Sequence, residues 1–298
     1  MQIVEVGPRD GLQNESVIVP TDRKIDYLEA LVEAGHTRIE AVSFVHPERV
    51  PQMADAEAVM TRAPRRNGVS YIGLVLNRRG VQRAIDTGVD EVNVVVVASD
   101  TFSRRNQGAG MDEVIDTTEQ ILADAVTARL PATVTIAAAF GCPFEGEVPL
   151  ERVVAIAERF GRSADEIALA DTIGVGAPAD VTERLSAVRE VTDASLRCHF
   201  HNTRNTGYAN AIAAVQAGVT ALDASSGGIG GCPFAPRATG NIATEDLQYL
   251  LSRSGFHTGL RLTDLLSPVD LVGELIGKQP PGLVRRAGDF PSAATERT

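Results

Sequence analysis

Two histidines, His199 and His201, are separated by a single residue within a run at residues 196–202 that predicts a β-strand. In a strand, side chains alternate between the two faces. Both imidazoles therefore face one side, whereas Cys198 and Phe200 face the other. Imidazole nitrogens that converge at a strand end are suitable ligands for a metal ion. On the pair alone, a polar strand end with solvated histidines is an equally good interpretation.

The placement of these histidines depends on the surrounding elements, and the chain contains eight short runs rich in Val, Ile and Ala. The run at residues 91–98 includes four consecutive valines, so it predicts a strand buried on both faces. Buried strands that alternate with helices predict a parallel sheet, and eight such units predict an α/β fold, the closed (β/α)8 TIM barrel. The predicted strands are residues 3–6, 38–44, 71–76, 91–98, 133–140, 166–171, 196–202 and 221–225.

Apolar positions between these strands recur at helical spacing. Thr21 is predicted to cap the first helix, whose apolar face includes Leu28 and Leu31, and Gly35 to end it. We expect one TIM-barrel catalytic domain over residues 1–279 and a flexible tail over 280–298, where no periodicity remains. The other predicted helices are residues 54–62, 112–128, 150–160, 178–191 and 206–217, with extra C-terminal helices at 244–252 and 262–277.

The bulk composition argues against several classes of function. The formal net charge is −11 and the pI is about 5.0, which argues against nucleic acid as the main partner. No apolar run approaches the roughly 20 residues of a membrane-spanning helix, so we expect no membrane partner. Three cysteines without a Cys-x-x-Cys motif, and no signal peptide before the first strand, favour reduced thiols and a cytoplasmic location.

In a barrel of this type, the active site is built from the carboxyl ends of the strands and the loops that follow them. The unusual polar residues of this chain fall at those ends, which favours a metal site over solvated histidines. These residues are Arg9, Asp10, Glu40, Ser43, Asn77, Asn106, Asp171, His199, His201, Cys232 and Asn241.

Four of these side chains form the predicted metal site, namely Asp10, His199, His201 and Asn241. The oxygen ligands and open water positions favour Mg²⁺ or Mn²⁺, while two imidazoles also suit Zn²⁺, Fe²⁺ or Co²⁺. A cation bound there can chelate a hydroxyl group and a neighbouring carboxylate or carbonyl, acting as Lewis acid and template.

Arg9 precedes the predicted ligand Asp10 and stays protonated at neutral pH. In this place it would stabilise an oxyanion or an enolate rather than act as an acid. The alternative is a structural salt bridge to Glu40 or Asp171, and the two roles can coexist. Glu40 and Asp171 are expected to orient the metal ligands and Arg9.

The stretch at residues 227–234 is rich in glycine and carries Cys232. Glycines let the backbone move and approach a ligand closely. A thiol at a mobile, polar rim is more reactive than a buried one, so Cys232 could supply a proton to a carbanion. A phosphate-binding loop and a plain tight turn are the alternatives. Cys142 is expected at the rim after the fifth strand, and Cys198 is expected to pack away from the site.

Two arginine pairs, Arg78-Arg79 and Arg104-Arg105, are predicted in the loops after the third and fourth strands. Basic pairs on the ligand side of an acidic protein could bind the phosphates of a nucleotide-like carrier. Solvated basic loops are the alternative, and they are the commoner outcome for any one such pair.

Six stretches of the chain carry a resemblance to a known family, at residues 4–15, 39–45, 50–55, 141–146, 171–176 and 228–246. Together they resemble the 3-hydroxy-3-methylglutaryl-CoA lyase family, within the metal-dependent barrel lyases and aldolases. The resemblance covers almost the whole chain up to the tail. The glycine-rich loop with its cysteine distinguishes the lyases from condensing synthases and hydroxy-oxoacid aldolases.

The resemblance implies cleavage of 3-hydroxy-3-methylglutaryl-CoA to acetoacetate and acetyl-CoA, a reaction of leucine breakdown, with Mg²⁺ or Mn²⁺ held at the four positions named above. It implies that Arg9 binds the substrate and stabilises an enolate, and that Cys232 is the catalytic cysteine. His199 and Asp10 are the candidates for the base. The predicted substrate-binding residues are Arg9, Gln13, Ser43 and Asn106. The expected partner is a small-molecule acyl-CoA, and a homodimer is the default expectation.

Some positions depart from the family pattern, in which Asp is usual at Asn202, Tyr-Gly at Arg204-Asn205, and lysines at Arg104-Arg105. These departures leave a lyase for citramalyl-CoA or a longer 3-hydroxy-3-alkylglutaryl-CoA open. A 2-oxoacid synthase that condenses acetyl-CoA is less favoured, because it predicts an allosteric domain that this length does not offer. A non-catalytic ligand-binding barrel is the third alternative.

Overall fold

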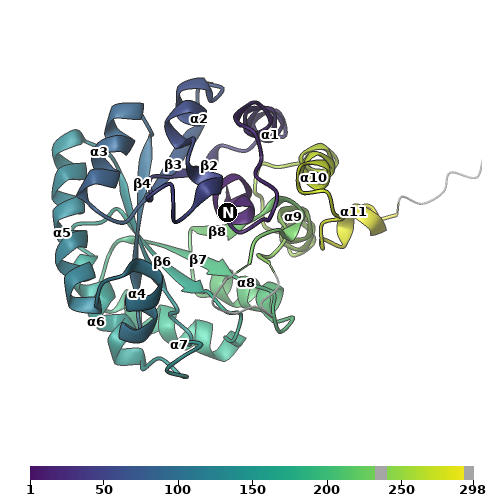
Figure 1. Ribbon diagram of the computed structural model, residues 1–298. Coiled ribbons are helices and arrows are strands. Elements are labelled where there is room, and N and C mark those ends of the chain that lie inside the picture. The colour runs from purple at the N-terminus through teal and green to yellow at the C-terminus, as the bar shows by residue number, and fades with distance from the viewer. Residues whose placement is uncertain (232–239, 292–298) are drawn as a thin grey trace, which may run out of the picture.

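A computed structural model describes residues 1–231 and 240–291, and its eight parallel strands close into a barrel, which confirms the predicted fold. Each strand pairs with the next one along the chain, and β1 pairs with β8. Figure 1 shows the helices arranged around the outside of the strands. The strands are β1 Gln2–Glu5, β2 Arg38–Ser43, β3 Ser70–Val75, β4 Glu91–Val97, β5 Ala132–Ala137, β6 Glu166–Asp171, β7 Ser195–Phe200 and β8 Ala221–Ala224.

The helices include the two extra C-terminal helices that the sequence predicts, α9 and α10. In the described part of the chain, no helix combines the length and apolar character that crossing a membrane requires. The helices are α1 Thr21–Glu33, α2 Ala56–Arg62, α3 Arg78–Thr87, α4 Asp100–Gln107, α5 Met111–Ala128, α6 Leu150–Phe160, α7 Pro178–Arg189, α8 Gly207–Gln216, α9 Thr244–Arg253, α10 Leu262–Ile276 and α11 Val284–Ala287, with short helices η1 Gly7–Gly11, η2 Pro51–Met53 and η3 Ser226–Gly228.

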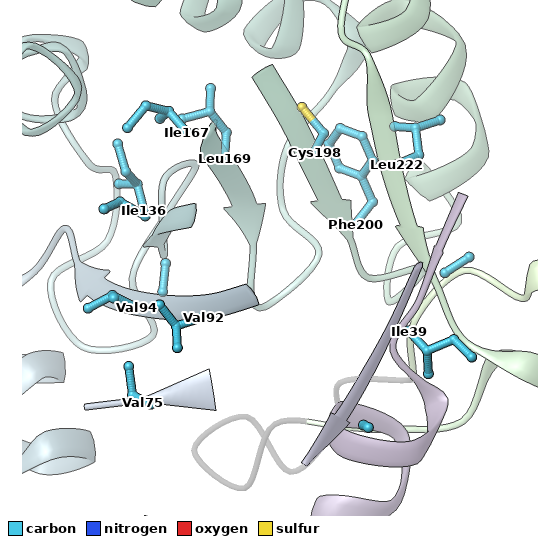
Figure 2. Packing of buried hydrophobic residues seen from close by; sticks show 14 of the residues in the cluster. Ile39, Val75, Val92, Val94, Ile136, Ile167, Leu169, Cys198, Phe200 and Leu222 are labelled. Atoms are coloured by element: carbon cyan, nitrogen blue, oxygen red, sulfur yellow. The ribbon is translucent and has the colours of Figure 1, made fainter. Parts of the chain in front are cut away.

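The hydrophobic core lies between the strands and the surrounding helices. On β7, Cys198 and Phe200 belong to this core, as strand parity predicts, whereas His199 on the other face of the strand does not. Figure 2 shows Cys198 and Phe200 on the same side of the strand, near Leu222. Burial raises the pKa of Cys198 well above its ordinary value, so this thiol stays protonated and packs as a small apolar group.

Helices α3 and α4 occupy segments that the sequence analysis assigned to loops, so that prediction is wrong. The side chain of Asn77 caps α3 by accepting a hydrogen bond from the N–H of Gly80 at 2.9 Å. Ser99 caps α4 in the same way, with the N–H of Phe102 at 3.2 Å. These caps satisfy backbone groups that the first helical turn leaves free. The two arginine pairs and Asn106 are therefore helical.

Several element boundaries also differ from the prediction, and two of these differences have a clear local cause. Thr21 does not cap α1, because the N-cap position is Pro20 and the Thr21 hydroxyl donates to Asp55 at 2.7 Å instead. Strand β5 ends at Ala137, earlier than predicted, because Ala138 adopts a left-handed conformation with φ at 54°.

The sequence predicts no regular element beyond Pro280, but the structure contains helix α11 there. The carboxylate of Asp246 on α9 accepts hydrogen bonds from the N–H groups of Leu283 at 2.9 Å and Val284 at 2.7 Å. This short helix is held by Asp246, which lies far away in the sequence, so local periodicity does not predict it.

Replacing Leu169 by alanine should destabilise the barrel. This side chain on β6 is 0% exposed, and truncation would leave a cavity in the core. The free energy of unfolding should therefore fall by about 2–5 kcal/mol, measured by urea unfolding followed by circular dichroism. The control is Val126→Ala, at a side chain that is 67% exposed, which should stay within about 0.5 kcal/mol. Equal losses in both variants would contradict this description of the core.

Candidate metal centre

The short π-helix η1 places Arg9 and Asp10 just beyond the carboxyl end of β1. Glycines at both ends of η1 allow close packing against neighbouring segments. A Cβ atom at Gly7 would lie 2.2 Å from the hydroxyl of Tyr27, and one at Gly11 would lie 2.8 Å from the side chain of Ile229. A larger residue would force η1 or these neighbouring side chains to shift, so the glycines allow the charged pair to lie where it does.

The carboxyl end of β7 brings the two histidines to the same mouth of the barrel. His199 lies in the strand, and His201 just after it pairs with Asn241 through the backbone. One ligand atom from each of Asp10, His199 and His201 lies within 4.8 Å of the other two. Asn241 joins them, since its Nδ2 donates to Oδ2 of Asp10 at 2.9 Å. The structure therefore gathers all four side chains that the sequence predicts as metal ligands.

Several atoms of this cluster are available to a ligand. Among the described residues, the buried Oδ1 of Asn241 and Nδ1 of His201 have no hydrogen-bond partner. Nδ1 of His199 is bound to Asp223, which leaves its Nε2 available. Buried polar atoms are normally paired, and these atoms are free to act as ligands. One carboxylate, two imidazoles and an amide oxygen form a donor set that fits a divalent cation.

The charge states of Asp10 and His201 also suit a cation. Burial alone would raise the pKa of Asp10, but Arg9 and the two histidines hold that pKa well below its ordinary value. Burial, reinforced by the neighbouring His199, lowers the pKa of His201 to about 4. An ionised carboxylate and a neutral imidazole are the forms that bind a metal ion.

Asp223 contacts this cluster and was missed by the sequence analysis. Its Oδ2 lies 3.1 Å from Nδ1 of His199, and the two residues are paired across β7 and β8. Burial lowers the pKa of His199, but the hydrogen bond to Asp223 and the charge of Asp10 together raise it above its ordinary value. The available signal was a charged residue within the otherwise apolar run of β8.

The guanidinium of Arg9 connects the cluster to the barrel interior. Its Nη1 donates to Asp10 at 2.7 Å, its Nε donates to Glu40 at 2.8 Å, and its Nη2 donates to the same Glu40 oxygen. Glu40 also accepts a hydrogen bond from Asn93 at 2.8 Å. The salt bridge to Glu40 that the sequence analysis considered is present. A guanidinium has more N–H donors than these three bonds use, so Arg9 can still bind an anion.

Asp171 has different partners from those expected. Its carboxylate oxygens accept the backbone N–H groups of Val175 and Gly176, each at 2.9 Å. It thereby closes the loop after β6 and, within the described residues, makes no hydrogen bond to Arg9 or to the histidines. No hydrogen bond in the described part of the chain therefore supports the prediction that Asp171 orients Arg9 and the metal ligands, because its carboxylate is bound to the N–H groups of its own loop.

The remaining predicted site residues lie at varied positions. Ser43 ends β2, and its buried Oγ has no hydrogen-bond partner within the described residues. Gln13 is half-buried just after η1, and Asn106 is exposed on α4 rather than in a loop. Cys232 lies outside the described residues.

The two arginine pairs are partly committed to contacts within the protein. Arg78 forms an ion pair with Asp124 at 2.8 Å, and Arg104 forms one with Asp100 at 2.7 Å. These ion pairs favour a surface role for Arg78 and Arg104 over the binding of a carrier's phosphates.

Cys142 follows the carboxyl end of β5, as predicted, and its side chain is buried. Its Sγ lies 2.9 Å from Oγ of Ser99 and accepts the backbone N–H groups of Phe144 and Glu145, each at 3.3 Å. These contacts stabilise the turn after β5.

Comparison with known proteins gives consistent matches. The family model described as HMGL-like matches residues 1–272. The hydroxymethylglutaryl-CoA lyase of Bacillus subtilis is 41% identical over 281 residues, which cover 94% of each chain. The crystal structure of a Bacillus subtilis HMG-CoA lyase superposes with a TM-score of 0.93 at 40% identity, covering 96% of this chain and 97% of that one. An HMG-CoA lyase from Acinetobacter baumannii, in complex with coenzyme A and 3-methylmalate, superposes with a TM-score of 0.93 at 36% identity over 98% of both chains.

Replacing His201 by alanine should weaken Mn²⁺ binding by about 100-fold or more, because loss of an outer contact alone costs about 10–100-fold. Isothermal titration calorimetry would measure the dissociation constant. The matched control is His257→Ala, which removes an exposed imidazole beyond α9 and should leave binding unchanged. A folded His201→Ala protein with undiminished Mn²⁺ affinity would exclude His201 as a ligand.

Proposed function

Because the chain belongs to the HMGL-like family, we propose that it is a carbon–carbon lyase that cleaves 3-hydroxy-3-methylglutaryl-CoA into acetoacetate and acetyl-CoA. The observation that carries the proposal is the convergence of Asp10, His199, His201 and Asn241 beside Arg9 at one mouth of the barrel. The similarity to lyases of this name over almost the full length of the chain supports the same reaction.

We propose Mg²⁺ or Mn²⁺ as the cation of the cluster. The carboxylate of Asp10 and the amide oxygen of Asn241 are hard oxygen ligands, which these ions favour. When bound, the cation would supply Lewis acidity to the tertiary hydroxyl of the substrate and to a neighbouring oxygen.

The bond that breaks joins the hydroxyl-bearing carbon to the carbon beside the thioester carbonyl. A base takes the hydroxyl proton, and the oxygen electron pair then forms the ketone of acetoacetate. The electron pair of the broken bond passes into the thioester enolate, which takes up a proton to become the methyl group of acetyl-CoA. His199 and Asp10 are the candidates for the base, either directly or through a water molecule.

Arg9 is the residue best placed to stabilise the enolate oxygen. Its charge is permanent, Glu40 and Asp10 fix its orientation, and it retains free N–H donors. Fixed donors aimed at developing negative charge lower the barrier without reorganisation. We propose Cys232 as the group that protonates the enolate.

Gln13, Ser43 and Asn106 are proposed to contact the substrate together with Arg9. The buried and unpaired Oγ of Ser43 supports this role near the reacting atoms. The related Acinetobacter lyase holds coenzyme A and 3-methylmalate, a branched hydroxy acid, which supports a branched hydroxyacyl-CoA as the substrate of this chain.

The cellular setting is part of the same proposal. We propose a cytoplasmic homodimer that acts in leucine breakdown, with residues 1–279 as its catalytic domain. The free thiols of Cys142 and Cys198 support a reducing compartment.

Incubating the purified protein with 3-hydroxy-3-methylglutaryl-CoA and Mg²⁺ or Mn²⁺ should release acetyl-CoA and acetoacetate in equal amounts. A chelator should abolish the release, and renewed addition of the ion should restore it. Parallel incubations with citramalyl-CoA, with a longer 3-hydroxy-3-alkylglutaryl-CoA, and with acetyl-CoA plus a 2-oxoacid separate the alternatives. Absence of acetyl-CoA release from the methylglutaryl substrate under both ions would refute the substrate assignment.

Replacing Arg9 by glutamine should lower kcat by about 10²–10³-fold, as expected for loss of a donor to an oxyanion. Steady-state kinetics at saturating Mn²⁺ would measure the change. The matched control is Arg159→Gln on α6, which removes an exposed guanidinium paired with Glu119 and should leave kcat unchanged. If Arg9→Gln lowers thermal stability but leaves kcat unchanged, Arg9 has only a structural role through its salt bridges and does not stabilise the enolate.

A further inference from the structure

A series of buried charges runs through the barrel interior beside the metal cluster, and no step of the proposed reaction uses it. Arg197 stands two residues before His199 on β7, so the two side chains share the interior face of the strand. Only 1% of Arg197 is exposed. Its Nε lies 3.2 Å from Oε2 of Glu166 and 3.5 Å from Oδ1 of Asp223. The guanidinium therefore lies between two carboxylates.

The series continues to the other end of the barrel. Glu166 at the start of β6 also accepts hydrogen bonds from Arg38 at 3.1 and 2.9 Å, and Arg38 pairs with Glu91 at 2.7 Å. Three carboxylates thus face only two guanidinium groups. Removing one partner from a buried ion pair leaves an uncompensated charge, which is costly, so each member restricts the positions of its neighbours.

Asp223 connects this series to the metal cluster. Its Oδ2 contacts Nδ1 of His199 at 3.1 Å, while its Oδ1 faces Arg197. The register of β7 and β8 places His199 opposite Asp223, so the backbone itself sets up the contact. A carboxylate at Nδ1 selects the tautomer in which the Nε2 lone pair is free for a cation, and it stops rotation of the ring.

We propose that Asp223 and Arg197 are positioning residues for the metal ligand His199, with Asp223 orienting the imidazole and Arg197 holding Asp223 in place. The inference rests on the proposed function only through the shared metal centre. Its consequence is metal affinity, which can be measured without any substrate. A purely structural role would instead lower stability and leave the Mn²⁺ dissociation constant unchanged.

The first test measures Mn²⁺ binding to the Asp223→Asn variant by isothermal titration calorimetry. An amide lacks the charge of the carboxylate and can present an N–H to His199, so the affinity should fall by about 10–100-fold. The increase in Tm on adding Mn²⁺ should shrink accordingly. Circular dichroism in the absence of metal would verify that the variant is folded.

The second variant, Arg197→Lys, keeps the buried positive charge and serves if Asp223→Asn does not fold. Lysine has no Nε group to lie between Glu166 and Asp223 as that of Arg197 does, and its compact ammonium does not replace a planar guanidinium. Mn²⁺ affinity should therefore still fall, on the order of tenfold. The matched control is Arg159→Lys on the outer surface of α6, which should bind Mn²⁺ normally.

A folded Asp223→Asn or Arg197→Lys protein that binds Mn²⁺ as tightly as the unchanged chain overturns this proposal. Weakened binding in these variants supports it even if the unchanged chain fails to cleave 3-hydroxy-3-methylglutaryl-CoA. That failure would instead overturn the proposed substrate, so the two outcomes are distinguishable.

Discussion

The ion pair between Arg9 and Asp10 is the contact on which the metal centre depends. Asp10 must stay ionised in a largely buried position, and the guanidinium at 2.7 Å supplies the compensating charge. Glu40 binds the opposite side of the same guanidinium, so Arg9 cannot turn away from Asp10. Arg9 and Asp10 lie in η1 after β1, and Glu40 lies within β2. Each depends on the others because a buried charge without a partner is costly.

Because side chains alternate along the strands, apolar residues that stabilise the fold lie on one face and the charged or metal-binding residues lie on the other. On β7, Cys198 and Phe200 pack into the core beneath the helices (Figure 2). Arg197 and His199 alternate with them and face the interior. On β8, Asp223 has the same interior orientation and meets them there. Because the apolar core outside the strands supplies most of the buried apolar contacts, the interior can be occupied by charged groups that pair with one another.

The sequence predicts those features that depend on local alternation and on barrel closure. Eight buried strand-like runs are sufficient to predict the barrel. Closure of the barrel brings Asp10 and His199 together, although they lie far apart in the chain. Helix α3 escaped prediction because a single polar cap, Asn77, starts a short helix with few apolar positions. The partners of Asp171 could not be predicted, because they depend on the conformation of the loop after β6. The role of Asp223 depends on the register between β7 and β8, which the local sequence around Asp223 does not reveal.

The ligands of the centre are fixed by two different physical means. His199 belongs to a strand, so its backbone is set by pairing with β6 and β8, and only rotation of the imidazole remains free. The contact with Asp223 removes that freedom. Asp10 and Asn241 lie instead on segments that follow the strands, and they fix each other through a hydrogen bond at 2.9 Å. The close packing of η1 further restricts Asp10. Change in the segments at the mouth of the barrel would therefore move Asp10 and Asn241, whereas His199 would keep the position that its strand and Asp223 give it.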